Sequence, residues 1–562
     1  MEERTGIDQL ALSMDRRHFL LLTAGGLGAL ALGACGDGDD REDVRSRPTA
    51  RLPFGAFGFP SPFASNGPPG YVQMSLLYDT LLWKDGTGVL LPWVAERVQR
   101  SSDNLTYTFE LRDGVRWSDG RALTVDDVVF TFEYYGRLQT LPPPVIGQPP
   151  RGITSVTATG PRTVAIRLGT ANVTFAEQVA GTIPILPKHI WEGVADPAAQ
   201  QDARILVGSG PYRLAPGYNG DGSPLLYEAN DEYFLGRPFV KRIEFTPVED
   251  QFAALLARAV DSASGQGVRN DVLARFRGEE FKTTTSRGGS TTGLYWNLPR
   301  GGALADARFR RACARAIDRA DLVNRLAGGN GRPGNPGFLG AENPFVVDVQ
   351  QYPYDVGAAN ALLDGAGYTR TDGGARRAPD GRPLRFELLV SNADTALGEL
   401  ISAALGRIGV ETSVRAVQPG PQLFGAKFSG MYEMALLGFP GPSAGSLNGD
   451  PDLLRQVFSS QSPPSLTGAS GYANAEFDDL AARQRVTFDE NERKRIVARM
   501  QEIIADDIPI LSLYSPDTSF VYRPAVLENW YLTPGRYPVD INNKHLFVTG
   551  LESGTTIRPF TE

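Results

Sequence analysis

Apolar and polar residues alternate without interruption over residues 105–112. Because successive side chains of a strand point to opposite faces, this period of two predicts a half-buried strand. Two Asp-Gly pairs then indicate tight turns on either side of a short strand over 115–118. Thr124 and Asp127 next have the spacing of a capping box with a shorter acid, which predicts the start of a helix.

A helical period follows in residues 309–317, where apolar residues recur every three to four positions. Cys313 lies on this apolar stripe, so we expect it to be a small buried hydrophobic residue. Asp318 and Asp321 favour the start of a second helix. Gly328 and the glycine after it can end that helix.

Strand and helix patterns alternate again in the second half of the chain. Residues 384–417 predict a strand, a helix from about Thr395 to Ile408, and a strand from Val410. Residues 491–514 predict a further helix and a strand after Pro509. A strand-helix-strand order implies parallel pairing. The chain is therefore expected to have an α/β fold with several sheets.

The N-terminal segment predicts export. Arg16 and Arg17 precede an uncharged apolar run over 19–34, shorter than the ~20 residues that a transmembrane helix needs. This order is typical of a secretory signal and resembles a twin-arginine (Tat) signal. Residues 32–35 resemble a lipobox, which would make Cys35 the lipidated first residue of the mature chain. A plain signal peptide or a single anchor helix is the alternative.

The segment that follows Cys35 is polar and without periodicity. We expect residues 1–35 to be the signal peptide and residues 36–50 to be a flexible tether. The working part is then extracytoplasmic, at the cell surface or in the periplasm, and anchored to the cell membrane.

Composition narrows the functional classes. The chain has 562 residues, a net charge of −8, 41% hydrophobic and 21% charged residues, which suits a soluble protein with two or more cores. The sequence has no basic run with interleaved aromatic residues, so nucleic-acid binding is not expected. His189 and His545 have no second ligand at metal-site spacing, and the sequence indicates no cofactor. With Cys35 lipidated, Cys313 has no partner for a disulfide.

One enzyme motif is present. Residues 441–445, GPSAG, fit the G-x-S-x-G elbow, and Asp540 and His545 follow in the order of a hydrolase triad. However, the residues after the motif do not favour an immediate helix, which the elbow requires. An exported serine hydrolase using Ser443 and His545 is therefore the alternative function. Residues 328–337 are glycine-rich, lack the P-loop lysine and predict a loop.

Six stretches, in order, resemble the landmarks of the family 5 extracellular solute-binding proteins of ABC importers, which include oligopeptide and dipeptide binders. They are residues 76–133, 185–191, 207–214, 227–245, 294–319 and 354–368. The resemblance implies a bilobed, periplasmic-binding-protein-like fold of type II, with crossing strands between the lobes. It implies a discontinuous lobe I from 51–80, 203–285 and 505–562, an extra N-terminal subdomain over 81–202, and a lobe II over 286–504. It also implies a ligand cleft closed by a hinge motion.

The resemblance also implies candidate ligand-binding residues. One cleft loop corresponds to Asn66, Gly67 and Pro68. Another corresponds to Gly438 and Phe439, where Phe439 either forms an aromatic wall or packs in the core.

Family members that bind oligopeptides carry an aspartate shortly after this second position, but here no acid occurs before Asp450. Ser443, Asn448 and Asp450 are the alternative pocket residues, for a different polar solute such as an oligosaccharide or an opine. A peptide stays the favoured ligand.

The expected partners are the ligand, a membrane-embedded ABC permease and the lipid bilayer, and the protein is expected to be a monomer that binds no nucleic acid. No catalytic residue and no metal ligand are expected. A ligand sensor with the same fold is a further alternative.

Overall fold

The computed structural model describes residues 49–549 except for ten segments. These are residues 56, 66, 87–88, 139–151, 217–223, 288–289, 419–420, 441–449, 463–467 and 533–542. The described residues belong to one compact unit, residues 45–562. They contain two large groups of buried side chains. We call the part of the fold around the first group lobe I. The part around the second group, which consists of two cores on the two faces of one sheet, is lobe II.

Lobe I is built around the strand predicted near residue 105. This strand is β5 (Thr106–Leu111), whose alternate residues are buried. It lies in a four-stranded sheet of order β4 (Ala95–Arg100), β5, β7 (Thr163–Leu168) and β6 (Ile153–Gly160). A second four-stranded sheet has the order β1 (Ala50–Leu52), β10 (Arg242–Phe245), β9 (Leu225–Ala229) and β8 (Tyr212–Leu214). Strands β2 (Leu82–Lys84) and β3 (Leu90–Pro92) form a hairpin.

The helices of lobe I include the predicted one after Thr124. Helix α2 (Val125–Arg137) begins with the expected capping box, in which the Thr124 backbone N–H donates to Asp127 Oδ2 at 2.9 Å. The other helices are α1 (Gly67–Ser75), α3 (Lys188–Trp191) and α14 (Lys544–Thr549), with a π-helical turn at Ala176–Ala180 and a 3₁₀ turn at Ala203–Ile205. One continuous core joins these helices and both sheets.

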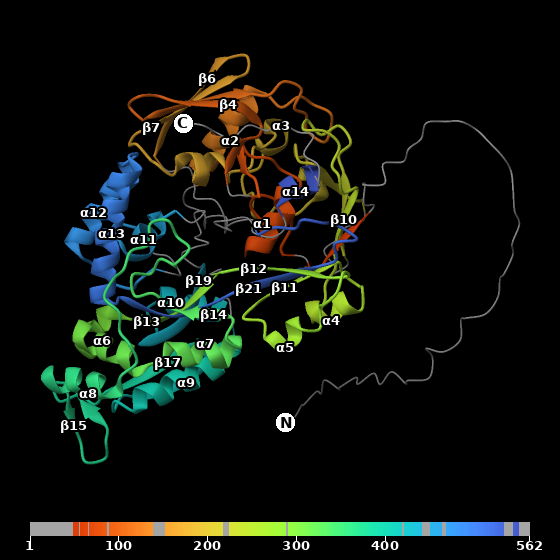
Figure 1. Cartoon of the computed structure of the whole chain (residues 1–562). Helices are drawn as coiled ribbons and strands as arrows, with labels where there is room; N and C mark the ends of the chain where they lie inside the picture. The colour runs from red at the N-terminus through yellow and green to blue at the C-terminus, as the bar shows by residue number, and fades with distance from the viewer. Residues whose placement is uncertain are drawn as a thin grey trace, which may run out of the picture. The chain divides into compact units, whose positions relative to one another are not determined.

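Lobe II contains a mixed six-stranded sheet (Figure 1). Its order is β14 (Gly331–Pro333), β20 (Ile510–Pro516), β13 (Ser290–Trp296), β19 (Met434–Pro440), β17 (Arg385–Ser391) and β18 (Glu411–Val417). The predicted strand-helix-strand unit is present, because β17 and β18 are parallel and α9 (Thr395–Gly406) connects them. Consecutive residues of each central strand alternate between two cores, so both faces of the sheet are covered.

The helices of lobe II divide between the two faces of this sheet. On one face pack α6 (Ala307–Ala316), α7 (Arg319–Ala327), α8 (Val356–Gly365) and α9. On the other pack α10 (Pro421–Phe428), α11 (Asp452–Phe458), α12 (Ala475–Val486) and α13 (Glu490–Asp507). Short 3₁₀ turns lie at Leu298–Arg300, Gly302–Ala305 and Asn392–Asp394, and β15 (Thr369–Arg370) pairs with β16 (Arg376–Arg377). As predicted, Phe309, Cys313 and Ala316 are fully buried.

A three-stranded sheet connects the lobes. Its order is β11 (Ser262–Gln266), β21 (Thr518–Tyr522) and β12 (Lys282–Ser286), with α4 (Gln251–Leu256) and α5 (Asn270–Leu273) beside it. The chain passes from β12 directly into β13 and from β20 directly into β21. The expected crossing strands are therefore present, and the fold is the expected bilobed α/β architecture.

The structure differs from the local expectations in three places. The short strand expected over 115–118 is only a single bridge between Arg116 and Ala122. The loop expected over 328–337 contains β14, because its backbone pairs with β20. Strand β20 belongs to the sheet of lobe II, although its residues fall within the 505–562 segment expected in lobe I. The domain limits as a whole stay a prediction.

Candidate functional site

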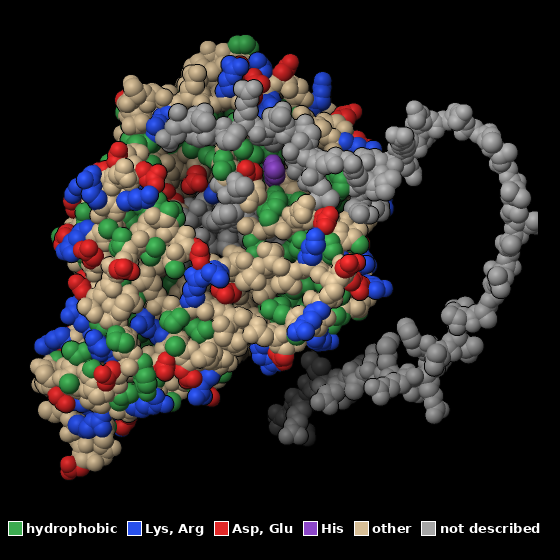
Figure 2. Space-filling view, in the orientation of Figure 1, with side chains coloured by type: hydrophobic (Ala, Val, Ile, Leu, Met, Phe, Trp, Pro, Cys, Tyr) green, Lys and Arg blue, Asp and Glu red, His purple; other side chains and the backbone are tan. Residues whose placement is uncertain are grey.

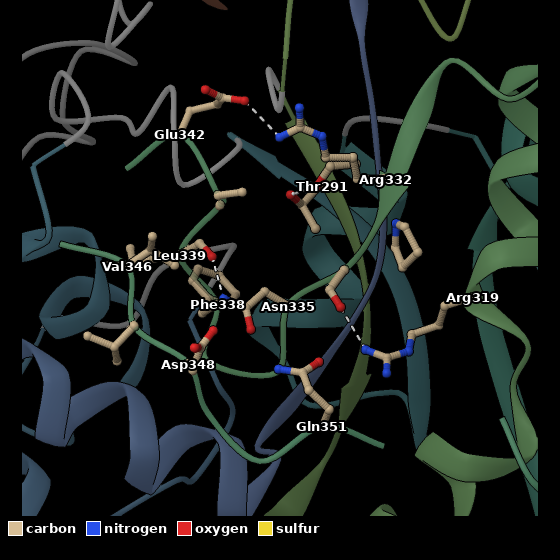
Figure 3. Close-up of a pocket in the computed structure, with 16 residues that line it drawn as sticks. Thr291, Arg319, Arg332, Asn335, Phe338, Leu339, Glu342, Val346, Asp348 and Gln351 are labelled. Atoms are coloured by element: carbon tan, nitrogen blue, oxygen red, sulfur yellow. Dashed lines mark hydrogen bonds and ion pairs between the residues drawn. The ribbon is translucent and has the colours of Figure 1, made fainter. Parts of the chain in front are cut away.

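A cavity of about 610 Å³ lies in lobe II beside both connections to the three-stranded sheet (Figure 3). Cavities of roughly 300–1,000 Å³ are typical for small ligands. The lining residues come from the starts of β13 and α7, from β14, from the end of β20, and from the loop over 334–351. They include Thr291, Arg319, Arg332, Asn335, Phe338, Asp348, Gln351 and Ser515. The cavity is therefore placed to couple a bound solute to the strands that cross between the lobes.

Two hydroxyl groups form the part of the wall nearest the crossing strands. The hydroxyls of Thr291 on β13 and Ser515 on β20 are hydrogen-bonded at 2.5 Å. Thr291 lies five residues after β12, and Ser515 lies three residues before β21. A solute that contacts these hydroxyls touches both chain connections between the lobes.

The loop after β14 forms the opposite wall. Gly334 passes so close to β20 that a Cβ atom there would lie 2.3 Å from the carbonyl oxygen of Ser512. Its backbone N–H donates to the Leu513 carbonyl at 2.9 Å. The Asn335 side chain then folds the loop by donating to the Leu339 carbonyl at 2.6 Å. Glycine at 334 therefore allows this loop to lie directly against β20.

Phe338 supplies the aromatic surface of the cavity. Its φ of 74° is in the left-handed region, and its side chain is 2% exposed. Its ring stacks on that of Phe439, with centroids 4.4 Å apart and planes at 15°. Sequence reasoning did not identify Phe338, because neither its backbone conformation nor its place under the cavity is visible in the local pattern.

The charged groups of the cavity differ in their surroundings. Arg332 forms an ion pair of 2.8 Å with Glu342, and both side chains are partly exposed. Asp348 is exposed. Arg319 is only 8% exposed and donates to two backbone carbonyl oxygens, that of Gly334 at 2.6 Å and that of Tyr352 at 2.9 Å. Burial lowers the pKa of Arg319.

The site residues expected near the end of β19 lie next to the cavity without lining it. Gly438 and Phe439 pair with Thr292 and Thr291 across the sheet. Phe439 is 2% exposed and belongs to the core on the α10–α13 face, behind Phe338. Of the two interpretations left open for Phe439, the structure shows the core position.

The remaining expected site residues give less information. Gly67 and Pro68 begin α1 in lobe I. Cys35, Asn66, Ser443 and Asn448 lie outside the described residues. Their expected roles stay predictions.

Asp450 already has a partner within the protein. Its carboxylate accepts hydrogen bonds from both terminal nitrogens of Arg493, at 2.7 and 2.6 Å, and neither side chain is more than 10% exposed. Its negative charge is thereby matched by a buried cation. This arrangement does not favour Asp450 as the counter-charge for a ligand ammonium group.

The hydrolase alternative can be followed only through His545, because Ser443 and Asp540 lie outside the described residues. His545 lies on α14 in lobe I, where its Nδ1 is 3.4 Å from the Tyr531 hydroxyl and burial lowers its pKa. His189 is hydrogen-bonded to Asp119 at 2.8 Å. In the described part of the chain, no group of three or more His, Cys, Asp and Glu side chains is placed to hold a metal ion.

Known proteins share both sequence and fold with this chain. The oligopeptide-binding protein AppA of Bacillus subtilis is 25% identical over 466 residues, which cover 79% of this chain and 81% of that protein. The dipeptide-binding protein of Escherichia coli is 27% identical over 493 residues, covering 84% and 88%. The solved structure of a periplasmic oligopeptide-binding protein from Thermotoga maritima has a TM-score of 0.75 at 23% identity, covering 91% and 99%.

A family model supplies the assignment. The model of the bacterial extracellular solute-binding proteins, family 5 Middle, matches residues 89–461. That range includes the sheet of β4, β5, β7 and β6, strand β13, the cavity loop and strand β19. The chain therefore belongs to the bacterial extracellular solute-binding proteins of family 5.

Proposed function

We propose that this protein captures a solute in a cleft between its lobes, of which the cavity of lobe II forms one side, and delivers it to the permease of an ABC importer. The observation that carries the proposal is the cavity of lobe II beside both crossing connections, in a chain of the family 5 solute-binding proteins. A solute held there contacts Thr291 and Ser515, so its binding free energy can shift the hinge equilibrium. Capture and release need no catalytic group, and we propose that the protein is not an enzyme.

A short peptide is the favoured solute. Relatives that align over most of this chain are named as oligopeptide-binding and dipeptide-binding proteins. The cavity volume of about 610 Å³ is large enough for a few residues in extended conformation. Asn335 and Gln351 offer amide groups that suit the hydrogen-bonding groups of a peptide backbone.

We propose that the protein works outside the cytoplasm, as a monomer attached to the membrane through lipidated Cys35. The support is the twin-arginine-like and lipobox-like order of residues 16–35. None of the helices that the structure describes is both long and apolar enough to cross a membrane. Cys35→Ser should move the protein from the membrane fraction to the soluble or secreted fraction, and continued tight membrane association of the variant would contradict lipid anchoring at this residue.

Native mass spectrometry of the full chain, purified without refolding, tests solute capture directly. We expect a mass excess that disappears on denaturation, together with a released compound that can be identified. A protein with no mass excess, and no thermal shift with peptides, sugars or opines, would contradict solute capture. A released compound that is not a peptide would contradict only the favoured solute class.

A further inference from the structure

The end of α10 and the turn after it carry the most exposed large apolar side chains that the structure describes. Met431 is 63% exposed and Phe428, the last residue of α10, is 59% exposed, whereas the next such side chain, that of Tyr354, is 43% exposed. Isolated apolar residues are normal on a protein surface. Two large ones three positions apart form a patch, which we call the Phe428–Met431 patch, and such a patch favours an interaction site.

Other parts of lobe II hold this turn in place. The Asn297 side chain donates to the carbonyl oxygens of Gly430 and Tyr432, at 3.0 and 2.7 Å. Arg300 donates to the same two oxygens, at 3.3 and 3.1 Å. Asn297 is only 4% exposed, so the turn is fixed to the interior of the lobe. The two apolar side chains of the patch are therefore exposed on a turn whose backbone is held at several points.

The charge beside the patch is positive. Arg300 is exposed, and within the described part of the chain no carboxylate lies within ion-pair distance of its guanidinium. Arg415 forms an ion pair of 2.7 Å with Glu387, whose backbone N–H donates to Glu433 at 2.7 Å. Lys427 is the third cation, and it is buried. Three cations therefore lie near two carboxylates, and the cation without an acid partner on the surface is Arg300.

A lipid bilayer with anionic headgroups is the partner that fits this patch. Phenylalanine and similar apolar side chains enter the boundary between headgroups and acyl chains, and a neighbouring cation is attracted to anionic headgroups. Figure 2 shows acidic and basic side chains interspersed over the face of the molecule that it draws, so no broad basic face is present there and the attraction is local. Residues 36–48 span at most about 45 Å when fully extended, so lipidation of Cys35 would hold the fold close to the bilayer.

We infer that the Phe428–Met431 patch is a membrane-contact surface of lobe II, which places both apolar side chains in the headgroup region of an anionic bilayer while Arg300 faces lipid phosphates. This inference rests on the proposed attachment to the membrane and adds the surface that touches it. Phe439, at the other end of β19, pairs with Thr291 of the cavity. The patch and the cavity thus lie at opposite ends of one strand, so one molecule can contact the membrane and hold a solute.

Fluorescence quenching on the full, lipidated chain tests this contact. Met431→Cys is labelled with an environment-sensitive fluorophore and reconstituted in vesicles of phosphatidylcholine and phosphatidylglycerol, with or without a doxyl quencher on the acyl chains. The native Cys313 is 0% exposed and does not compete for the label. Tyr354→Cys is the matched control, because Tyr354 is also exposed in lobe II but lies before α8, outside the patch. We expect quenching at position 431 to be at least about threefold that at position 354.

Equal quenching at the two positions would overturn the inference and leave solute capture, which native mass spectrometry measures separately, intact. A chain that stays out of the vesicle fraction would contradict lipid attachment and the membrane contact together.

Variants of the labelled chain identify the residues responsible. Phe428→Ser should lower quenching at position 431 by about half or more, because one of the two apolar side chains is lost. Arg300→Gln should lower it in the anionic vesicles but not in pure phosphatidylcholine, and Arg300→Lys should restore part of the loss. Arg325→Gln is the matched control, because Arg325 is an exposed arginine on α7 that pairs with Asp321. Unchanged quenching in Phe428→Ser, or equal losses in Arg300→Gln and Arg325→Gln, would overturn the assignment.

Discussion

The turn between α12 and α13 should control how tightly the solute is held, although it lies in a different part of lobe II from the cavity. Its contacts reach lobe I: the Val173 backbone N–H donates to the Arg485 carbonyl at 2.9 Å. The guanidinium of Arg100 on β4 lies 4.2 Å from the ring centroid of Phe488. Figure 1 shows this turn close to β7, away from the crossing strands β11, β12 and β21. A hinge motion that opens the lobes must break these contacts.

Phe488→Ala removes the cation–π contact and leaves the backbone hydrogen bond in place. Both side chains are half-buried, so the contact contributes about 1 kcal/mol. Loss of that amount from the closed state shifts the closed-to-open ratio about fivefold. If the solute binds the closed state, its apparent Kd should then rise by up to about fivefold with no change in the cavity itself.

Isothermal titration with the solute that co-purifies measures this effect, and small-angle scattering measures the degree of closure. Val486→Ala is the matched control, because Val486 lies at the same turn and is 41% exposed. We expect the control to bind like the wild type and Phe488→Ala to melt within a few degrees of it. Unchanged affinity of Phe488→Ala, or an equal loss in Val486→Ala, would refute the closure argument.

Three further predictions concern stability. In the wild type, the fully buried Asp79 lies 2.5 Å from Lys544 Nζ, and Lys544→Met leaves it without its cation. This substitution should lower the free energy of unfolding by about 3–5 kcal/mol in urea titrations. A loss under about 1 kcal/mol would contradict a paired buried charge. The folded pKa of Lys427 is about 8, below its ordinary 10.5, so the unfolded state binds more protons between these two pH values. The unfolding free energy of the wild type should therefore gain about 3 kcal/mol over that of Lys427→Met between pH 8 and 10.5. A pH-independent difference would argue against this prediction. Phe439→Ala should cost about 3–5 kcal/mol in thermal or urea unfolding, whereas Phe428→Ala, which removes a ring that is 59% exposed, should cost little; equal losses would contradict the core position of Phe439.

The elements were predictable where a single local pattern decides them. The alternation that predicts β5, the capping box of α2 and the apolar stripe of α6 each depend on a few neighbouring residues. Phe439 shows the limit of such reasoning. Its phase along β19 places it on the same face as Leu437, but only the packing of α10–α13 decides that this face is covered. Phe338 has no local signal, because its exposed or buried state depends on the path of the loop after β14.

The cavity itself was not predictable, because segments far apart in the sequence form it. Thr291, Arg319 and Ser515 come together only when β20 pairs with β13 and α7 packs beside them. Arg319 follows Asp318, and in the sequence this pair indicates nothing more than the start of a helix. In the fold, Arg319 is 8% exposed and donates to the backbone carbonyl oxygens of Gly334 and Tyr352. These contacts depend on the path of the chain after β14, which the local sequence does not determine.

Arg319 lies in the cavity beside the crossing strands, and this position bears on the order of events in solute capture. Arg319 contacts the loop that packs on β20, and β20 continues directly into the crossing strand β21. A solute held in the cavity therefore binds at the base of the hinge, whereas the Arg100–Phe488 contact stabilises closure at the α12–α13 turn. Because the two contacts share no side chain, their effects on binding free energy should add within about 0.5 kcal/mol. A double variant of Arg319→Lys and Phe488→Ala that binds much more weakly or more tightly than this sum would show that closure and solute binding in the cavity are one step, not two.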